Sequence, residues 1–282
     1  MRTFFMTKPM QVSQWRRFAS AEVATEDADA LLQFVTGWSL TQIFLRGDDV
    51  LDPEQLQQLN ACLARRRDGE PVAHITGSRG FWTLDLEVNE HTLIPRADTE
   101  TLIEAVLARV DRDASLRILD LGTGSGAIAL ALASELKNAS VTATDESEDA
   151  LNVARRNANK HSLNNISFKR GSWFDALNHD ERFDVIVSNP PYIADGDEHL
   201  HKGDLRFEPV SALSSGVDGL DDIRVIAKHA ARFLRANGWL FFEHGYDQAD
   251  AVQALLRDEG YQDITTLRDF GGNDRVTLAS HR

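Results

Sequence analysis

The sequence SNPPYIAD (188–195) places side chains that could take part in catalysis directly after a buried strand. The stretch before it, FDVIV (183–187), is a short apolar run typical of such a strand. The two prolines remove two backbone donors and stiffen the chain, so their carbonyls face outward without N–H partners from the same residues. The loop therefore displays an amide (Asn189), free carbonyls and an aromatic ring (Tyr192) together.

These side chains and carbonyls could bind a planar NH₂ group that accepts a methyl group. The lone pair of such a nitrogen is delocalised into a carbonyl or a ring, which makes it a poor nucleophile. The Asn189 side-chain oxygen and the Pro190 carbonyl could hold its two N–H bonds, and Tyr192 could stack on the flat group. With a sulfonium as methyl donor, in-line alignment can contribute several kcal/mol. No strong base is needed, because the proton becomes acidic once the nitrogen is methylated.

A second candidate site is the glycine-rich stretch ILDLGTGSGAIALALA, where Gly122 to Gly126 separate a strand from a helix. Small residues there let the backbone approach a ligand, and the helix N-terminus offers free N–H groups. If Ala127 is counted as the third small residue, the loop matches the dinucleotide-binding pattern G-x-G-x-x-G/A. If Gly126 is counted instead, the loop matches the pattern G-x-G-x-G of S-adenosylmethionine (SAM) methyltransferases, which an acidic residue precedes, here Asp120. Asp145 ends the next strand and could accept hydrogen bonds from the ribose of either cofactor.

The two loops together favour SAM over a dinucleotide. Ligands of such sheets bind at the carboxyl ends of the strands near the topological switch, so the loop at 189–192 is expected to face the glycine loop. A hydride-transfer enzyme would have no use for that loop. The plainer alternative is a rigid loop that only ends a strand.

For four other polar residues the sequence supports a function less strongly. His199 and His201 with Asp195 and Asp197 could suggest a metal, but the segment is loop-like and its ligand set is not typical, so we expect no metal.

Three further residues could carry chemistry. Glu243 and His244 end a predicted strand at the same sheet edge and could be an acid–base pair, although we expect them to hold the loop in place. Cys62 is the only cysteine and lies among leucines at helical spacing, so we expect a buried apolar residue and not a nucleophile.

The composition narrows the class of protein. The chain has 282 residues, 42% hydrophobic and 26% charged, which is typical of a soluble globular protein. Without a bilayer-spanning run or a signal-peptide core, and with one cysteine, it is expected to be cytoplasmic. The net charge of −14 argues against binding of nucleic acid through an extended basic surface and favours a small-molecule or protein substrate.

The elements that must position these residues change in type along the chain. Residues 1–76 predict helices only, and 77–95 predict a β-hairpin linker, because apolar residues from Trp82 onward alternate with polar ones. In 96–282 helices and strands alternate, with one helix expected over 223–238. This pattern indicates an α/β fold, a doubly wound, largely parallel sheet with helices on both faces.

The chain resembles the HemK/PrmC family of amino-methyltransferases over nearly its whole length. The segments that carry the resemblance are RRRDGEPVAHITG, FWTLDLEV, TLIPRADTE, ILDLGTGSGAIALALA, SNPPYI, RFEPVSAL, FFEHG and RDFGGNDR, in this order. The N-P-P-Y element alone is shared with DNA adenine methyltransferases, whereas the flanking segments are specific to the family. Ala97 stands where the family usually has proline, which affects only the stiffness of that loop.

The resemblance implies a class I SAM-dependent methyltransferase with a mostly parallel seven-stranded sheet and a small N-terminal helical domain that docks the substrate. It implies methyl transfer to the side-chain amide nitrogen (N5) of the glutamine in the Gly-Gly-Gln motif of bacterial class I peptide chain release factors. The implied SAM contacts are Gly122, Thr123, Gly124, Ser125, Gly126, Asp145, Trp173 and Asn189. The implied glutamine contacts are Asn189, Pro190, Pro191 and Tyr192, with Asn189, Pro190 and Tyr192 catalytic.

Two other functions are open at this point. A nucleic-acid adenine-N6 methyltransferase is one, since that exocyclic nitrogen is also a conjugated NH₂, but the acidic charge and the lack of a basic, aromatic-interleaved target domain count against it. A SAM-binding adaptor without activity is the other, and the complete N-P-P-Y element counts against it. We expect a monomer that makes no direct contact with nucleic acid or membrane.

Overall fold

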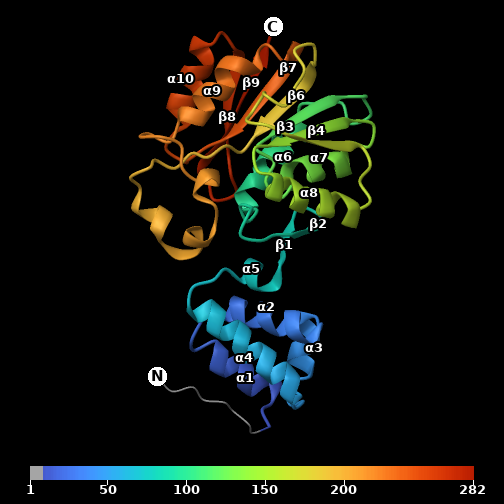
Figure 1. Cartoon of the computed structure of the whole chain (residues 1–282), viewed down its shortest axis with the longest axis vertical. Helices are drawn as coiled ribbons and strands as arrows, with labels where there is room; N and C mark the ends of the chain where they lie inside the picture. Colours follow the sequence, from blue (N-terminus) through green and yellow to red (C-terminus); the bar gives the residue numbers. More distant parts are fainter. Residues whose placement is uncertain (1–8) are drawn as a thin grey trace. The chain divides into compact units, whose positions relative to one another are not determined.

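The computed structural model describes residues 9–282, with the exception of the His201 side chain, as two compact units that divide between Gly77 and Ser78 (Figure 1). Over this part of the chain, every helix is too short or too polar to cross a membrane.

The secondary structure elements of residues 9–77 in the first unit are all helices, as the sequence pattern predicts. Its helices are α1 (Val12–Ala19), α2 (Thr25–Thr36), α3 (Leu40–Leu45), α4 (Pro53–Arg67) and α5 (Val72–Thr76). Apolar residues at helical spacing form its core, in which Trp15, Leu31 and Leu59 are fully buried. Cys62 is 8% exposed within this core, which confirms the apolar position that its spacing predicts.

The second unit begins with a hairpin of β1 (Ser78–Phe81) and β2 (Leu84–Glu87). The alternation in the sequence predicts that Trp82 belongs to a strand, but the structure places it in the turn, with a φ of 54°. Its backbone N–H donates to Glu100 Oε1 at 2.8 Å and its indole N–H donates to Glu135 Oε1 at 2.7 Å. These two bonds to the body of the unit hold the turn where local alternation predicts a continuous strand.

A seven-stranded sheet forms the centre of the second unit. Its strands are β3 (Arg117–Leu121), β4 (Ser140–Asp145), β5 (Ile166–Arg170), β6 (Phe183–Ser188), β7 (Leu234–Glu243), β8 (Gln262–Arg268) and β9 (Asp274–His281). They lie in the order β5-β4-β3-β6-β7-β9-β8. The first five of this order pair in parallel, and β9 is antiparallel to both of its neighbours. The predicted fold class is confirmed.

Helices cover both faces of this sheet (Figure 1). They are α6 (Glu100–Leu107), α7 (Ala127–Glu135), α8 (Glu148–Lys160), α9 (Asp221–Ala230) and α10 (Ala249–Asp258), and short 3₁₀ turns include η1 (Ala97–Thr99). Ile118 of β3 packs with α6 and α7, whereas Leu119 and Leu121 pack with α9 and α10. The chain leaves β3 toward β4 and β5 and returns as β6, so the ends of β3 and β6 meet at the topological switch.

One helix is shorter than its sequence predicts. The expected helix over 223–238 ends at Ala230, and β7 begins at Leu234. Leu234 pairs with Phe183 of β6, and both side chains are buried. Pairing in the sheet therefore outweighs the helix propensity of this segment.

Candidate active site

The glycine loop joins β3 to α7 at the edge where the parallel strands end. Gly122, Gly124 and Gly126 have φ values of 72°, 55° and 86°, a left-handed backbone that favours glycine. A Cβ on Gly122 would lie 3.3 Å from the Trp173 ring, and one on Gly126 would lie 2.9 Å from the Leu130 side chain. The absence of a side chain therefore leaves room for the Trp173 ring at Gly122 and for Leu130 and Ala154 at Gly126.

Asp145, the last residue of β4, holds this loop through its carboxylate. Its Oδ2 accepts a hydrogen bond from Gly124 N at 2.8 Å, and its Oδ1 accepts one from Ser147 N at 2.9 Å. Burial raises the pKa of this carboxyl, and the two amides oppose that shift. Each oxygen keeps acceptor capacity. The geometry thus permits the predicted contact with two neighbouring hydroxyls.

Asp120 lies beneath the loop and is fully buried. Its Oδ2 accepts hydrogen bonds from Thr123 Oγ1 at 2.6 Å and from Ala129 N at 3.2 Å, which fixes the loop to the first turn of α7. Its Oδ1 has no hydrogen-bond partner among the residues that the structure describes, and burial raises its pKa to about 7. Asp120 therefore supports the loop from inside.

Trp173 follows β5 and lies with its ring against Gly122. Its φ of 45° is unusual for a large side chain, and its carbonyl accepts a hydrogen bond from Thr144 Oγ1 at 3.3 Å. The half-buried indole is placed to stack on a flat heterocycle next to the glycine loop.

The loop after β6 begins at a fixed point of the sheet, because Ser188 Oγ donates to Leu121 O of β3 at 2.8 Å. Asn189 follows, and its Nδ2 donates to Thr99 Oγ1 at 3.4 Å. This arrangement leaves the Asn189 side-chain oxygen as an acceptor. Pro190 is buried behind it.

Tyr192 is held by two hydrogen bonds. Its Oη donates to Glu243 Oε1 at 3.4 Å, and its carbonyl accepts a hydrogen bond from Gln248 Nε2 at 2.9 Å. Burial raises the pKa of the Tyr192 hydroxyl above its ordinary value.

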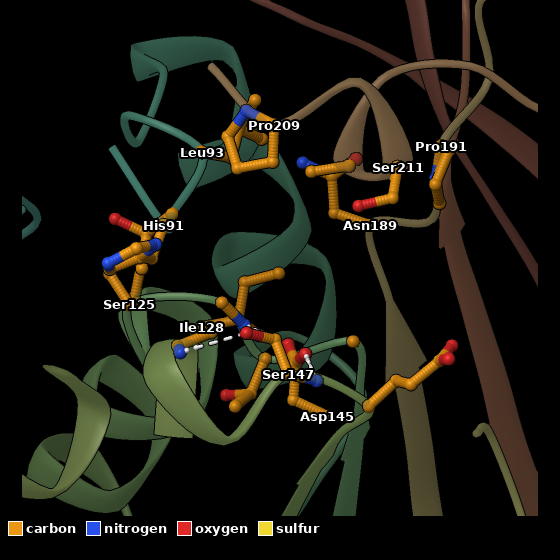
Figure 2. Close-up of a pocket in the computed structure, with 18 of the residues that line it drawn as sticks. His91, Leu93, Ser125, Ile128, Asp145, Ser147, Asn189, Pro191, Pro209 and Ser211 are labelled. Carbon is orange, nitrogen blue, oxygen red and sulfur yellow. Dashed lines mark hydrogen bonds between the residues drawn. The ribbon is translucent and has the colours of Figure 1, made fainter. Parts of the chain in front are cut away.

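These loops border one cavity of about 590 Å³ (Figure 2). Its walls are formed by residues 90–93, 95, 99, 122–125, 127–128, 145–147, 150, 170–173, 189, 191, 209, 211–212 and 222. Of the residues that the sequence suggests for cofactor or substrate, those in the walls are Gly122, Thr123, Gly124, Ser125, Asp145, Trp173, Asn189 and Pro191. Gly126, Pro190 and Tyr192 are not among the residues that line it. The structure therefore brings the glycine loop and the loop after β6 to one cavity, as expected.

Two walls of this cavity, 90–95 and 209–212, have no counterpart in the predicted site. Glu208 joins them: its Oε2 accepts a hydrogen bond from Ile94 N at 3.0 Å, and its Oε1 pairs with Arg96. The Glu208 side chain is 0% exposed. Burial raises its pKa, and Arg96 opposes the shift. The sequence around Glu208 carries part of the family resemblance but gives no signal for this link.

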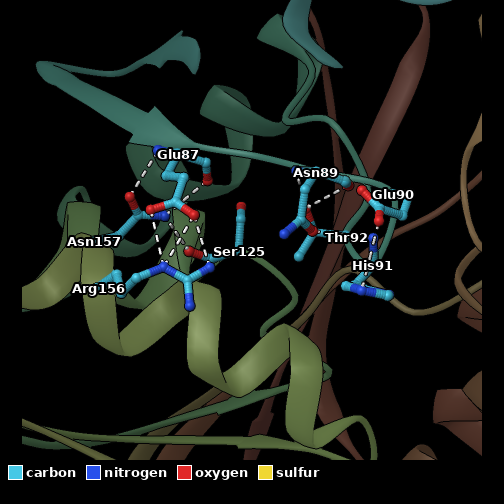
Figure 3. A network of polar contacts seen from close by, with 8 residues as sticks. All are labelled: Glu87, Asn89, Glu90, His91, Thr92, Ser125, Arg156 and Asn157. Atoms are coloured by element: carbon cyan, nitrogen blue, oxygen red, sulfur yellow. Dashed lines mark hydrogen bonds and ion pairs between the residues drawn. The ribbon is translucent and has the colours of Figure 1, made fainter. Parts of the chain in front are cut away.

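A polar network joins the hairpin to the glycine loop (Figure 3). Asn157 of α8 is fully buried, and its Nδ2 donates to Ser125 O and to Glu87 O, each at 3.0 Å. Its Oδ1 accepts a hydrogen bond from Glu87 N at 2.7 Å, and the Glu87 carboxylate pairs with Arg156 at 2.7 Å. The segment that leaves β2 for the cavity wall is thus fixed at its start.

His244 follows Glu243 at the end of β7 and is fully buried. Its Nδ1 is 2.8 Å from Gly245 O, and its Nε2 is 2.8 Å from Thr277 Oγ1. Since a carbonyl only accepts, Nδ1 carries the proton and Nε2 accepts from the Thr277 hydroxyl. Burial lowers the pKa of this imidazole. With both nitrogens engaged, His244 supports the strand end and is not placed for acid–base chemistry.

Polar side chains of residues 195–199 form hydrogen bonds within the loop region. His199 Nδ1 lies 2.6 Å from Asp197 Oδ1, and Asp195 Oδ1 accepts a hydrogen bond from Ser214 Oγ at 2.6 Å. Within residues 9–282, the His201 side chain excepted, no three His, Cys, Asp or Glu side chains are grouped as metal ligands.

Comparison with known proteins gives two family matches. Residues 112–265 match a methyltransferase domain, and residues 12–77 match the PrmC N-terminal domain. A release factor glutamine methyltransferase of Xylella fastidiosa strain Temecula1 is 50% identical over 260 residues, 92% of this chain and 94% of that protein. One of Escherichia coli strain K12 is 47% identical over 277 residues, 96% of this chain and 99% of that protein. The fold is also similar to that of a methyltransferase from Pyrococcus furiosus, with a TM-score of 0.52 at 19% identity over 77% of this chain and 95% of that one.

Proposed function

The chain belongs to the release factor glutamine methyltransferase family, and we propose that it transfers the methyl group of SAM to N5 of the glutamine in the Gly-Gly-Gln motif of bacterial peptide chain release factors. The observation that carries this proposal is that Asn189 and Pro191 border the same cavity as Asp145 and the glycine loop. A group that accepts a methyl and the molecule that donates it could therefore meet there.

The residues around the cavity fit SAM. Asp145 would accept hydrogen bonds from the ribose hydroxyls, Trp173 would stack on the adenine, and Gly122 to Ser125 would contact the cofactor through their backbone. The cavity of about 590 Å³ lies within the range of about 300–1,000 Å³ common for small-molecule sites. When bound, SAM supplies an electrophilic methyl group on a sulfonium.

The residues of the loop after β6 orient the substrate nitrogen. Asn189 Oδ1 accepts one N–H of the glutamine amide and the Pro190 carbonyl accepts the other, which directs the nitrogen lone pair toward the methyl carbon. SAM bound beside the glycine loop would supply the methyl group: the nitrogen lone pair would form the new N–C bond, the electrons of the broken C–S bond would stay on sulfur to give S-adenosylhomocysteine, and the nitrogen would lose a proton to water. Tyr192 keeps the loop in place and, with movement of its ring, stacks on the amide.

We assign recognition of the release factor to the N-terminal helical unit, because a protein substrate must dock through surfaces well beyond the cavity and residues 12–77 match the PrmC N-terminal domain. We propose that the enzyme acts as a monomer. Its substrate is a translation factor, so the enzyme works in the cytoplasm without direct contact to nucleic acid.

A transfer assay with methyl-labelled SAM tests this function. Purified release factor, the same factor with its Gly-Gly-Gln glutamine replaced by alanine, DNA and RNA are offered separately. Label in the unmodified release factor alone is the expected result. Label in nucleic acid alone would favour the adenine-N6 alternative, and SAM binding without transfer to any of the four would favour the inactive adaptor.

A further inference from the structure

The carbonyl of Tyr192 is held by a side chain that is not among the residues lining the cavity. Gln248, the N-cap residue of α10, donates from Nε2 to Tyr192 O at 2.9 Å and to Asp218 O at 3.3 Å. Its Oε1 accepts a hydrogen bond from Gly245 N at 2.8 Å. Because a backbone N–H only donates and a carbonyl only accepts, these three partners fix which end of the Gln248 amide faces Tyr192.

Gly219 leaves room for this hydrogen bond. It is buried and has a φ of 74°, and a Cβ at this position would overlap Tyr192 O and lie 2.9 Å from Gln248 Nε2. A larger residue would therefore displace the Tyr192 carbonyl, the Gln248 amide or both. The contact thus depends on two residues that lie in different segments of the chain.

The loop after β6 is held on both sides of its prolines. At its start, Ser188 is bonded to β3 through its hydroxyl. Just after the loop, Ile193 N donates to Leu213 O at 2.9 Å. The two prolines between these points have φ fixed near about −65°, so few backbone torsions are free. The direction of the Pro190 carbonyl therefore depends on where the Tyr192 end of the loop is held.

We propose that Gln248 positions the loop after β6 for methyl transfer by holding the Tyr192 carbonyl. The inference rests on the proposed function, in which Asn189 Oδ1 and the Pro190 carbonyl orient the glutamine nitrogen. Two carbonyl oxygens converge on the Gln248 NH₂ group, so an acceptor in its place would repel both and move the Tyr192 end of the loop. Gln248 is thus a positioning residue that acts through the loop and does not touch the substrate.

An isosteric variant of Gln248 tests this role. Gln248→Glu keeps an acceptor for Gly245 N but turns a carboxylate oxygen toward the Tyr192 carbonyl. It should lower kcat on release factor by about 10- to 100-fold at pH 8, because a small misplacement of the acceptors costs that much. The Kd for SAM should change far less, since the glycine loop and Asp145 stay in place.

Gln253→Glu is the matched control for this variant. Gln253 also belongs to α10, and its Nε2 donates to Thr266 Oγ1 at 2.8 Å, away from the cavity walls. This control should keep the kcat of the unmodified enzyme. Equal kcat values for Gln248→Glu and Gln253→Glu would overturn the proposal. So would a loss of SAM affinity in Gln248→Glu as large as its loss of kcat, because the effect would then not be specific to the loop.

A second variant reaches the same carbonyl from another side. Gly219→Ala brings a methyl group against Tyr192 O and should lower kcat in the same way, also if Gln248→Glu fails to fold. Its matched control is Gly260→Ala, because Gly260 has a similar φ of 85° and a Cβ there meets nothing within 4 Å. Equal kcat values for these two alanine variants would contradict a role for the Tyr192 carbonyl.

A further measurement needs no release factor. Deuterium uptake by the peptide 188–195 should be faster in Gln248→Glu than in Gln253→Glu, because the Ile193 N–H opens more often when the Tyr192 carbonyl is released. Equal uptake would overturn the proposal. If uptake rises but the unmodified enzyme methylates no release factor, the hold on the loop stands and the proposed function fails.

Discussion

Replacing Asp145 with alanine should weaken SAM binding by about 10- to 100-fold. The carboxylate is the charged acceptor placed to receive the ribose hydroxyls, and loss of a hydrogen bond to a charged group costs about 1.5–3 kcal/mol. A cost of about 1.4 kcal/mol corresponds to a tenfold change in Kd. The variant also removes the acceptor of Gly124 N and Ser147 N, so the glycine loop loses support in the same step.

Calorimetric titration of SAM into the folded variant measures this effect. Asp149→Ala is the matched control, because Asp149 is an exposed residue of α8 that lies outside the cavity walls and carries the same charge. Asp145→Asn should give an intermediate Kd, since its amide oxygen still accepts but without charge. A Kd for Asp145→Ala equal to that of the control would mean that the ribose does not lie at the end of β4.

Three further predictions concern the walls of the cavity and the residues behind them. Gly122→Ala should lower SAM affinity in calorimetry, because it strains a backbone with φ of 72° and brings a methyl group to 3.3 Å from the Trp173 ring; unchanged affinity would contradict this placement. Glu208→Ala leaves Ile94 N unpaired and should lower the free energy of unfolding by about 1–3 kcal/mol in denaturant titrations, while an equally stable variant would show that the link is not structural. Glu243→Gln should be more stable than the unmodified enzyme at pH 8, by on the order of 3 kcal/mol, and equal to it below pH 4.5. The folded pKa of Glu243 is raised from 4.5 to about 7, so its contribution to stability is present below pH 4.5 and is lost as the pH rises to 7; a variant less stable at pH 8 would refute this sign.

The parts of the site that the sequence predicts depend on local patterns and one topological rule. Glycines with positive φ between a strand and a helix, and Asp145 at the next strand end, follow from short stretches of sequence. That the loop at Asn189 meets them follows from the parallel order of β3 and β6. Both inferences need only the type of each element and the direction of its strand.

The remaining parts depend on partners far along the chain. Glu208 meets Ile94 and Arg96 across more than a hundred residues, and nothing near it in sequence marks it as buried. The local sequence predicts a strand at Trp82, but Trp82 lies in a turn because side chains of α6 and α7 hold it there. Residues 234–238 favour a helix locally but belong to β7, in which Leu234 pairs with Phe183 of β6. In each case tertiary contacts outweigh a local preference.

The central claim is that Asn189 directs a methyl group to one glutamine nitrogen, and mass spectrometry of release-factor peptides after incubation with enzyme and SAM tests it most directly. With the unmodified enzyme, the account predicts one methyl mass on the glutamine of the Gly-Gly-Gln peptide. With Asn189→Ala, turnover should fall by about 10²–10³, while release factor and SAM still bind. A methyl group on another residue, no methyl group at all, or near-normal turnover in Asn189→Ala would contradict the account.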